Sequence, residues 1–232
     1  MSEFTLSKRL HKVSEYVLGG TVADIGSDHA HLPVYLVKSG VCEYAIAGEV
    51  NEGPLDSAKE NISKHELTCK VEARLGNGLD VLADRAADTI VIAGMGGPLI
   101  SSILEHGKDH LAFVTRLVLQ PNVAGDHVRG WLYSNGWKLI TETILEEDGH
   151  IYEIIVAEKG EESIYQDNNR EKLIWLGPYL LPEKEDAFKQ KWAREKKQLY
   201  AIQSNLQHAK SDSESKLQAI AKKITWLEEE GL

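Results

Sequence analysis

A short segment near the N-terminus, in which a β-branched run ends in an acid and a glycine, constrains the fold of this chain most. Residues 21–25 favour a strand, Gly26 follows directly, and a helical pattern begins at Leu32. Because glycine lacks a Cβ, a ligand can approach the backbone there, and the free N–H groups of the next helix point at the same place. Only one glycine of the dinucleotide fingerprint G-x-G-x-x-G is present. The segment predicts a nucleotide-type crevice that is not a dinucleotide site, with a plain strand–turn–helix as the alternative.

Strand and helix patterns alternate over residues 1–160, which predicts an α/β domain with a parallel sheet covered by helices. The apolar side of a leading helix carries Leu6, Leu10, Val13 and Val17. Gly19-Gly20 is expected to end this helix. The expected strands are 21–25, 44–49, 70–75, 89–93 and 116–120. The expected helices between them are 32–39, 54–65, 98–106 and 126–135.

Asp24 and the two β-rich runs that end the alternating region indicate the same class of α/β domain. Asp24 precedes Gly26 in a D-x-G pattern, which resembles motif I of methyltransferases that use S-adenosylmethionine (SAM). Two β-rich runs, 137–145 and 151–158, are joined through Asp148-Gly149, a strong hairpin signal. A final antiparallel hairpin is typical of the Rossmann-like class I SAM-dependent methyltransferase domain, whereas a dehydrogenase domain would end in another parallel strand.

The last third of the chain predicts a helical appendage. Residues 161–182 form a connecting segment that Gly177-Pro178 and Pro182 keep from being one long helix. Within 183–232, a first helix has heptad-like apolar spacing at Phe188, Trp192, Leu199, Ile202, Leu206 and Ala209, which Glu195 interrupts. After a polar break at 210–215, a second helix carries Leu217, Ile220, Ile224 and Leu227. We expect an antiparallel α-helical (coiled-coil) hairpin, and the spacing leaves self-packing and substrate binding both open.

Composition bounds the class of protein. A chain of 232 residues can hold one α/β domain and a small appendage. The first residues form no signal peptide and no stretch is long enough to span a membrane, so we expect a cytoplasmic protein without a membrane or obligate protein partner. Cys42 and Cys69 have no zinc-like spacing, so we expect no metal.

Charge is distributed unevenly along the chain. The net charge is −10, yet residues 163–232 carry 12 Lys and Arg against 11 Asp and Glu. An acidic protein that binds nucleic acid must do so through local basic patches. The candidates are Lys8, Arg9 and Lys12 near the N-terminus and Lys189, Lys191, Arg194, Lys196 and Lys197 in the tail.

Four segments follow strands of the expected sheet, and ligands bind at that edge in open α/β sheets. The first contributes Asp24, Gly26, Ser27 and Asp28, and the second contributes Glu49 and Val50. Glu49 lies 25 residues after Asp24, where a carboxylate can hold two ribose hydroxyls; a surface glutamate is the alternative. The third contributes Asn77 and Gly78, and the fourth contributes Ala93, Gly94 and Met95.

The third and fourth segments depart from common methyltransferase patterns. Asn77 stands where an aspartate usually accepts from the adenine amino group, and its carbonyl can still accept; a glycine-rich turn is the alternative. The fourth segment lacks the Asn/Asp-Pro-Pro-Tyr motif of enzymes that methylate an exocyclic amino group, and neither cysteine follows a proline at a strand end. A ring nitrogen remains as the target.

Six segments in order carry a more specific resemblance: Leu6–Leu10, Ala23–Ala30, Ile46–Glu49, Ile92–Gly97, Leu119–Asn122 and Leu145–Gly149. Together they resemble the bacterial tRNA (adenine-22) N1-methyltransferase family, known as TrmK. The resemblance implies a Rossmann-like domain followed by a C-terminal coiled coil, SAM as the cofactor with S-adenosylhomocysteine (SAH) as its product, and tRNA as the partner. It also implies SAM-binding roles for the Asp24–Asp28, Glu49 and Asn77-Gly78 segments.

The implied chemistry needs few catalytic groups. Adenine N1 has an in-plane lone pair that attacks the methyl group without prior deprotonation, so alignment matters more than a strong base. N1 lies on the Watson–Crick edge, so the base must be unpaired or extruded. We expect Asp28 to hold the exocyclic amino group, with His29 and Asn122 orienting the base. The alternatives are helix capping or packing for His29 and a turn for Asn122.

Two rival functions are also compatible with the sequence. One is a SAM-dependent methyltransferase that acts on a small molecule or protein, against which the helical tail and the basic patches argue. The other is a non-catalytic SAM- or RNA-binding module, against which the full set of motifs argues.

Overall fold

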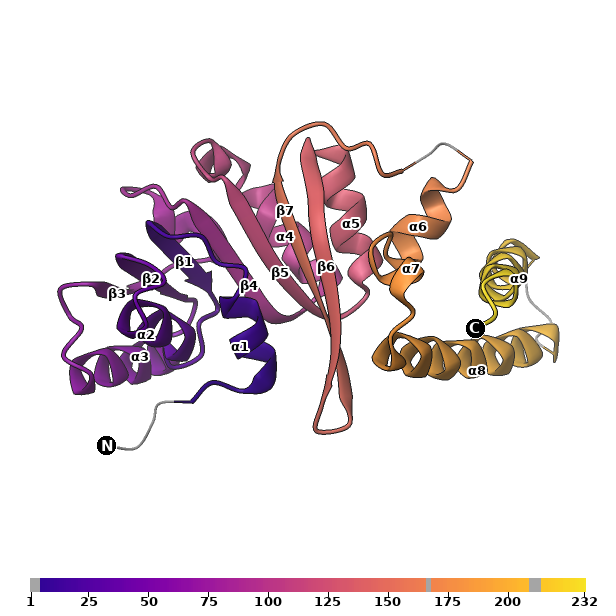
Figure 1. The fold of residues 1–232 in the computed structure, drawn as a ribbon, viewed down its shortest axis with the longest axis horizontal. Helices are drawn as coiled ribbons and strands as arrows, with labels where there is room; N and C mark the ends of the chain where they lie inside the picture. Colours follow the sequence, from indigo (N-terminus) through magenta and orange to yellow (C-terminus); the bar gives the residue numbers. More distant parts are fainter. Residues whose placement is uncertain (1–4, 166–167, 209–213) are drawn as a thin grey trace.

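The computed structural model describes residues 5–165, 168–208 and 214–232. Seven strands form one sheet in the order β3-β2-β1-β4-β5-β7-β6. They are β1 (Thr21–Ile25), β2 (Tyr44–Glu49), β3 (Val71–Leu75), β4 (Thr89–Gly96), β5 (Arg116–Val123), β6 (Trp137–Glu147) and β7 (His150–Lys159). Pairing is parallel except along β7, which is antiparallel to both β5 and β6 (Figure 1). The predicted Rossmann-like sheet with a terminal antiparallel hairpin is confirmed.

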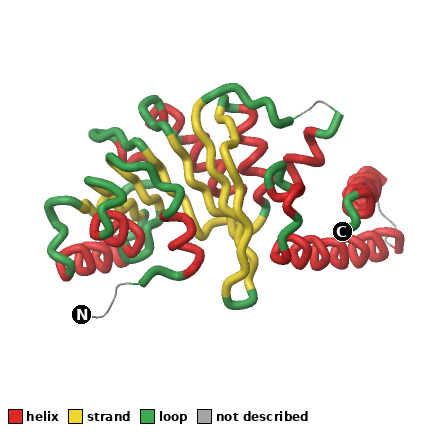
Figure 2. The backbone as a smooth tube through the Cα atoms, viewed as in Figure 1, coloured by secondary structure: helices red, strands yellow, loops and turns green. Residues whose placement is uncertain are grey.

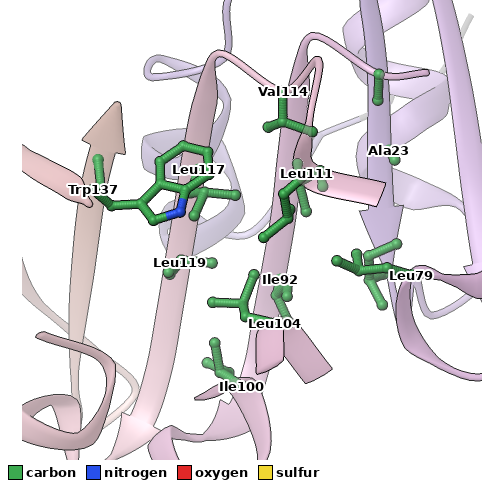
Figure 3. Packing of buried hydrophobic residues seen from close by; sticks show 14 of the residues in the cluster. Ala23, Leu79, Ile92, Ile100, Leu104, Leu111, Val114, Leu117, Leu119 and Trp137 are labelled. Atoms are coloured by element: carbon green, nitrogen blue, oxygen red, sulfur yellow. The ribbon is translucent and has the colours of Figure 1, made fainter. Parts of the chain in front are cut away.

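Helices cover both faces of this sheet (Figure 2). They are α1 (Lys8–Ser14), α2 (His31–Lys38), α3 (Glu52–Lys64), α4 (Gly97–His106) and α5 (Gly125–Ser134), with short 3₁₀ turns η1 (Gly78–Leu82) and η2 (Lys108–Leu111). Successive strand residues face opposite layers: Ile92 packs with Ile100 and Leu104 of α4, as Figure 3 shows, whereas Val91 packs in the layer of α1–α3. The sheet is therefore buried on both faces, as parallel sheets usually are.

Many element boundaries differ by one or two residues from the sequence-based expectation, and the C-terminal ends of α1, β4 and β5 differ by more. The leading helix ends at Ser14 and not at Gly19-Gly20, because the N–H groups of Tyr16 and Val17 bond three residues back in turns. Strands β4 and β5 run three residues further than expected, to Gly96 and Val123, and their pairing is irregular around Met95. Strand β4 therefore continues through the glycine-rich segment that we expected to follow it.

The β6–β7 turn has the expected form. Glu147 pairs with His150, so Asp148 and Gly149 alone form the connection. Their φ angles are 51° and 79°, the left-handed values that a two-residue hairpin turn requires.

The C-terminal part consists of α6 (Arg170–Leu176), α7 (Leu180–Glu183), α8 (Asp186–His208) and α9 (Glu214–Glu229). The helical pair α8–α9 is present as predicted, and in Figure 1 α9 is seen nearly end-on while α8 lies across the view, so the helices cross. The apolar core of this part joins Phe188, Trp192 and Leu199 to Ile224 and Leu227. Residues from the predicted connecting segment, Trp175, Leu176 and Leu180, belong to the same core.

The expected apolar seam of α8 is shorter in the structure. Ile202 is 45% exposed, so its inward placement was wrong. Ala209 and most of the polar break at 210–215 lie outside the described residues.

No helix in the described parts of the chain is long and apolar enough to cross a membrane. Within the same residues, no group of three or more His, Cys, Asp or Glu is arranged to hold a metal ion.

Candidate functional site

The first sequence motif forms a tight turn at the carboxyl end of β1. Asp24 is buried and its carboxylate accepts a hydrogen bond of 2.8 Å from Ser27 Oγ. Gly26 has φ +72°, and a Cβ on it would lie 2.3 Å from Met95 Cε. The left-handed conformation favours glycine at this position, whereas the Met95 methyl is the end of a flexible side chain that can shift.

The next three residues, Asp28, His29 and Ala30, all have left-handed backbone, with φ angles of 43°, 62° and 55°. This conformation costs an L-residue about 1–2 kcal/mol. Asn61 helps to hold it, because its side chain donates to the His29 carbonyl at 2.8 Å. Strained backbone of this kind is typical of ligand-binding turns.

Glu49, at the end of β2, is only 6% exposed. In the part of the chain that the structure describes, its Oε1 is buried without a hydrogen-bond partner. Burial raises the pKa of Glu49, and the backbone N–H groups of Asp28 and Ser27 oppose this increase. A buried acceptor without a partner is costly, so the site fits a ligand with hydroxyl donors, such as the ribose of SAM.

Burial also raises the pKa of Asp24, to about 7. The hydrogen bond from Ser27 opposes this shift, the negative charge of Glu49 adds to it, and the positive charge of Arg9 reduces it. The site therefore favours a positively charged ligand, which would stabilise the ionised carboxylate.

Asp24 opens into a hollow of about 310 Å³ at this edge of the sheet. Its polar lining consists of Arg9, Asp24, Ser27, Asp28, His31, Asn122 and Tyr152. The hollow brings together the predicted residues Asp28 and Asn122 from the ends of β1 and β5. His29 does not line it; its ring lies 3.5 Å from the Asp28 carboxylate and next to the ring of His31. Asp28 is well placed for an incoming base, since its side chain is 87% exposed.

Buried Gln120 organises one wall of the hollow and was not predicted. Its Oε1 accepts from Arg9 and from the Gly94 N–H at 3.0 Å. Its Nε2 donates to Asn122 Oδ1 at 3.1 Å, and Asn122 Nδ2 donates to the Gly94 carbonyl at 2.8 Å. The orientation of the Asn122 amide is therefore fixed, with one N–H left for a ligand.

His31 and Tyr152 were also missed by sequence reasoning. Tyr152 comes from β7 and lies under the Arg9 guanidinium, 5.2 Å from ring centroid to Cζ. No local pattern marks a residue of a distant hairpin as part of this site.

The remaining cofactor candidates lie further along the same edge. Asn77 and Gly78 line a separate hollow of about 480 Å³ together with Leu99, Ile103 and His106. Val50, next to Glu49, is 61% exposed. Ala93, Gly94 and Met95 line the hollow of Asp24.

The basic candidates have different surroundings. Lys8 donates to the Glu146 carbonyl at 2.9 Å, Lys12 pairs with Glu15 at 2.7 Å, and Arg9 lies inside the hollow. On α8, Lys189 and Lys197 are exposed, whereas Lys196 donates to the carbonyl of Leu232 at 2.5 Å.

A buried ion cluster connects α8 to the sheet. Arg129 of α5 is fully buried and pairs with Glu142 of β6 at 2.5 Å and with Glu153 of β7 at 3.2 Å. Lys191 of α8 pairs with the other oxygen of Glu153. Burial opposes the ionisation of Glu153, but the charges of Lys191 and Arg129 outweigh it and lower the pKa.

Comparison with known proteins gives one family. The model of the family "tRNA (adenine(22)-N(1))-methyltransferase" matches residues 22–229. The Bacillus subtilis tRNA (adenine(22)-N(1))-methyltransferase is 44% identical over 99% of this chain and 98% of its own length. The crystal structure of the B. subtilis M1A22 tRNA methyltransferase TrmK has a TM-score of 0.93 at 43% identity, covering 98% of this chain and 99% of that one.

A second structure is that of a putative tRNA (m1A22) methyltransferase from Streptococcus pneumoniae in complex with SAM. It has a TM-score of 0.85 at 40% identity and covers 97% of this chain and 99% of that one. This chain belongs to the tRNA (adenine(22)-N(1))-methyltransferase family.

Proposed function

We propose that this protein transfers a methyl group from SAM to N1 of adenine 22 in tRNA, releasing SAH. The observation that carries the proposal is the hollow that buried Asp24, exposed Asp28 and Asn122 line together. The relatives named as tRNA (adenine(22)-N(1))-methyltransferases, one of them solved with SAM, support the same activity.

The cofactor follows the carboxyl edge of the sheet in this proposal. Asp24, Gly26 and Ser27 receive its positively charged methionine end, and Ala93–Met95 form the opposite wall. Glu49 accepts from the ribose hydroxyls, which satisfies its unpartnered oxygen. Asn77 and Gly78 bind the adenine, and Val50 covers it. SAM, when bound, supplies the electrophilic methyl group.

The chain's own residues then align the target base. The Asp28 carboxylate accepts from the exocyclic amino group, which becomes more acidic as the ring gains positive charge, so the interaction strengthens in the transition state. Asn122 donates its remaining N–H to the base edge, in an orientation that Gln120 fixes. His29 lies outside the hollow and acts on the base only through Asp28.

In this proposal the RNA is held by cations of α1 and α8, two separate helices that flank the β6–β7 hairpin (Figure 1). Lys8, Lys189 and Lys197 are exposed, whereas Lys12 and Lys196 are half-buried and would exchange their present partners for phosphates. We divide the chain into a catalytic domain (1–160), a connecting segment (161–182) and a helical domain (183–232), and we place the enzyme in the cytoplasm with its tRNA substrate.

Mass spectrometry of nucleosides tests this function. Unmodified tRNA incubated with the protein and SAM should yield N1-methyladenosine, and the same tRNA with guanosine at position 22 should yield none. Product from the guanosine-22 tRNA would refute the position, and no product from either tRNA would refute RNA methylation. Transfer of the methyl group from SAM to a small molecule or protein, and not to tRNA, would support the rival function, a methyltransferase of another substrate class.

A further inference from the structure

A second hollow lies on the other side of Asn122 from the hollow of Asp24. Its volume is about 290 Å³, and it lies between the end of β5, the start of β7 and α8. Asn122 lines both hollows, so they adjoin at this side chain. Figure 1 shows the β6–β7 turn extending past the sheet beside the first part of α8.

We propose that this second hollow, the flanking groove, holds the nucleoside next to the target adenine. The proposal rests on the proposed function, since it requires an RNA whose adenine occupies the hollow of Asp24. The neighbouring nucleoside is covalently linked to that adenine, and the flanking groove adjoins the hollow at Asn122. When the target adenine enters the hollow of Asp24, the nucleoside linked to it must therefore lie nearby, and the flanking groove is in position to receive it.

The lining of the groove combines apolar and polar groups, as a site for a nucleoside requires. Pro121, Val123 and Ile151 provide apolar surface for the face of a base. His150, Arg194 and Gln198 provide polar groups for its edge. Ligand sites commonly combine an apolar wall with a few polar groups that fix orientation.

The charges of the groove favour a nucleoside over a bare phosphate. Lys191 pairs with Glu153, whose second oxygen faces Arg129, so the Lys191 charge is compensated. Arg194 donates one N–H to the Gly149 carbonyl at 3.2 Å and has further donors for a ligand. Half-buried Glu195 also lines the groove and would repel a phosphate, but it can accept from an amino or ribose hydroxyl group.

Ion pairs connect the elements that form the groove. Lys191 of α8 and Glu153 of β7 line the groove and pair with each other, and Glu153 also pairs with Arg129 of α5. A preformed site loses less conformational freedom on binding than a mobile one.

Filling the groove tests the proposal. Gln198 is an exposed α8 residue that lines the groove, and Gln198→Trp should occupy it without disturbing the core. Gln190→Trp places the same side chain on an exposed position of α8 outside the groove. We expect Gln198→Trp to lower kcat/KM for tRNA at least about tenfold, the size of one lost hydrogen bond to a charged group. SAM affinity in both variants and tRNA kinetics of Gln190→Trp should match the wild type.

Synthetic tRNAs with an abasic residue at position 21 or 23 identify the occupant. If the base at one of these positions fills the groove, removing that base should lower kcat/KM of the wild type. Arg194→Ala should then lower kcat/KM little further with the same abasic tRNA. An abasic residue at the other position should leave the Arg194→Ala effect at full size. Additive losses at both positions, or wild-type kinetics for Gln198→Trp, would overturn the groove assignment. Failure of the wild type to methylate tRNA would instead overturn the proposed function.

Discussion

The guanidinium of Arg9 donates a hydrogen bond to the side-chain carbonyl of buried Gln120, across 111 residues of sequence. The same carbonyl accepts from the Gly94 N–H, and the Arg9 guanidinium lies over the ring of Tyr152. Arg9 thus connects its own helix, α1, to the end of β5 and to the terminal hairpin. This placement makes it a positioning residue of the hollow, although its sequence neighbours are surface cations.

Arg9→Ala should therefore affect turnover more than RNA affinity. We expect a loss of about tenfold or more in kcat at saturating SAM, because a hydrogen bond from a charged group contributes about 1.5–3 kcal/mol. The salt dependence of tRNA binding should not change. Lys8→Ala is the matched neighbour, and it should reduce that slope by about one unit per lost phosphate contact. A reduced slope with unchanged kcat in Arg9→Ala would show that Arg9 is a phosphate contact instead.

Glu49→Ala should weaken SAM binding and leave the fold intact. The substitution removes Oε1, a buried acceptor without a partner in the described part of the chain, together with the carboxylate that the N–H groups of Asp28 and Ser27 favour, so these two effects oppose each other and the free energy of unfolding should change little. Loss of the hydrogen bonds to a charged group should reduce SAM affinity by about 1.5–3 kcal/mol. Calorimetry and urea denaturation measure both quantities, with Glu60→Ala, an exposed acid on α3, as control. Unchanged SAM affinity in folded Glu49→Ala would exclude the ribose contact.

Asp28→Ala should separate catalysis from cofactor binding. The Asp28 carboxylate lines the hollow and is largely exposed, as a group that meets an incoming base must be. We expect turnover at saturating SAM to fall about 10²–10³-fold, the usual cost of removing a group that stabilises transition-state charge. SAM affinity, measured by calorimetry, should change much less. Near-normal turnover would remove Asp28 from the base contact.

SAM binding should depend on pH through Asp24. Its pKa of about 7 in the ligand-free protein means that part of the population is protonated near neutrality. A cationic ligand favours the carboxylate, so binding should release protons, and affinity should rise with pH and level off above about 7. Calorimetry in buffers of different ionisation enthalpy measures this release, and Asp24→Asn should abolish it. Binding without proton release at pH 6.5 would contradict the placement of the cation.

The same group should affect stability in the opposite direction. The folded protein binds more protons than the unfolded chain between the ordinary pKa of 3.8 and the folded value of about 7. The Asp24 contribution to the free energy of unfolding therefore falls as pH rises through this window. Asp24→Asn should flatten that part of the stability profile in urea denaturation.

Arg129→Ala should be the most destabilising of these substitutions. It leaves the carboxylates of Glu142 and Glu153 buried near each other with only Lys191 as a nearby cation in the described structure. Breaking a buried ion pair from one side costs about 3–5 kcal/mol. Urea denaturation should show this loss, and Lys189→Ala, at an exposed position of α8, should show little. A change below about 1 kcal/mol would mean that the cluster adjusts without Arg129.

Local patterns in the sequence determined the order of elements and the edge at which the site forms. The run Thr21–Ile25 followed by Gly26 predicted a strand that enters a tight turn, and Asp148-Gly149 predicted a hairpin. Each turn depends on the backbone conformation of only one or two residues, so the local sequence is enough to predict it. The position of Asp24, Asp28 and Glu49 at this edge was also predictable, because each lies at or just after the end of a strand, and their roles in binding stay predictions.

Only the tertiary structure decided which distant side chains meet there. Sequence placed Arg9 among surface cations and gave no role to Gln120 or Tyr152, because nothing in their local spacing records that α1, β5 and β7 converge. His29 was expected in the hollow, but three left-handed residues in succession turn its ring outward. Periodicity defines the faces and ends of elements, whereas contacts between elements depend on how the whole sheet is assembled, and that assembly created the hollow and the flanking groove.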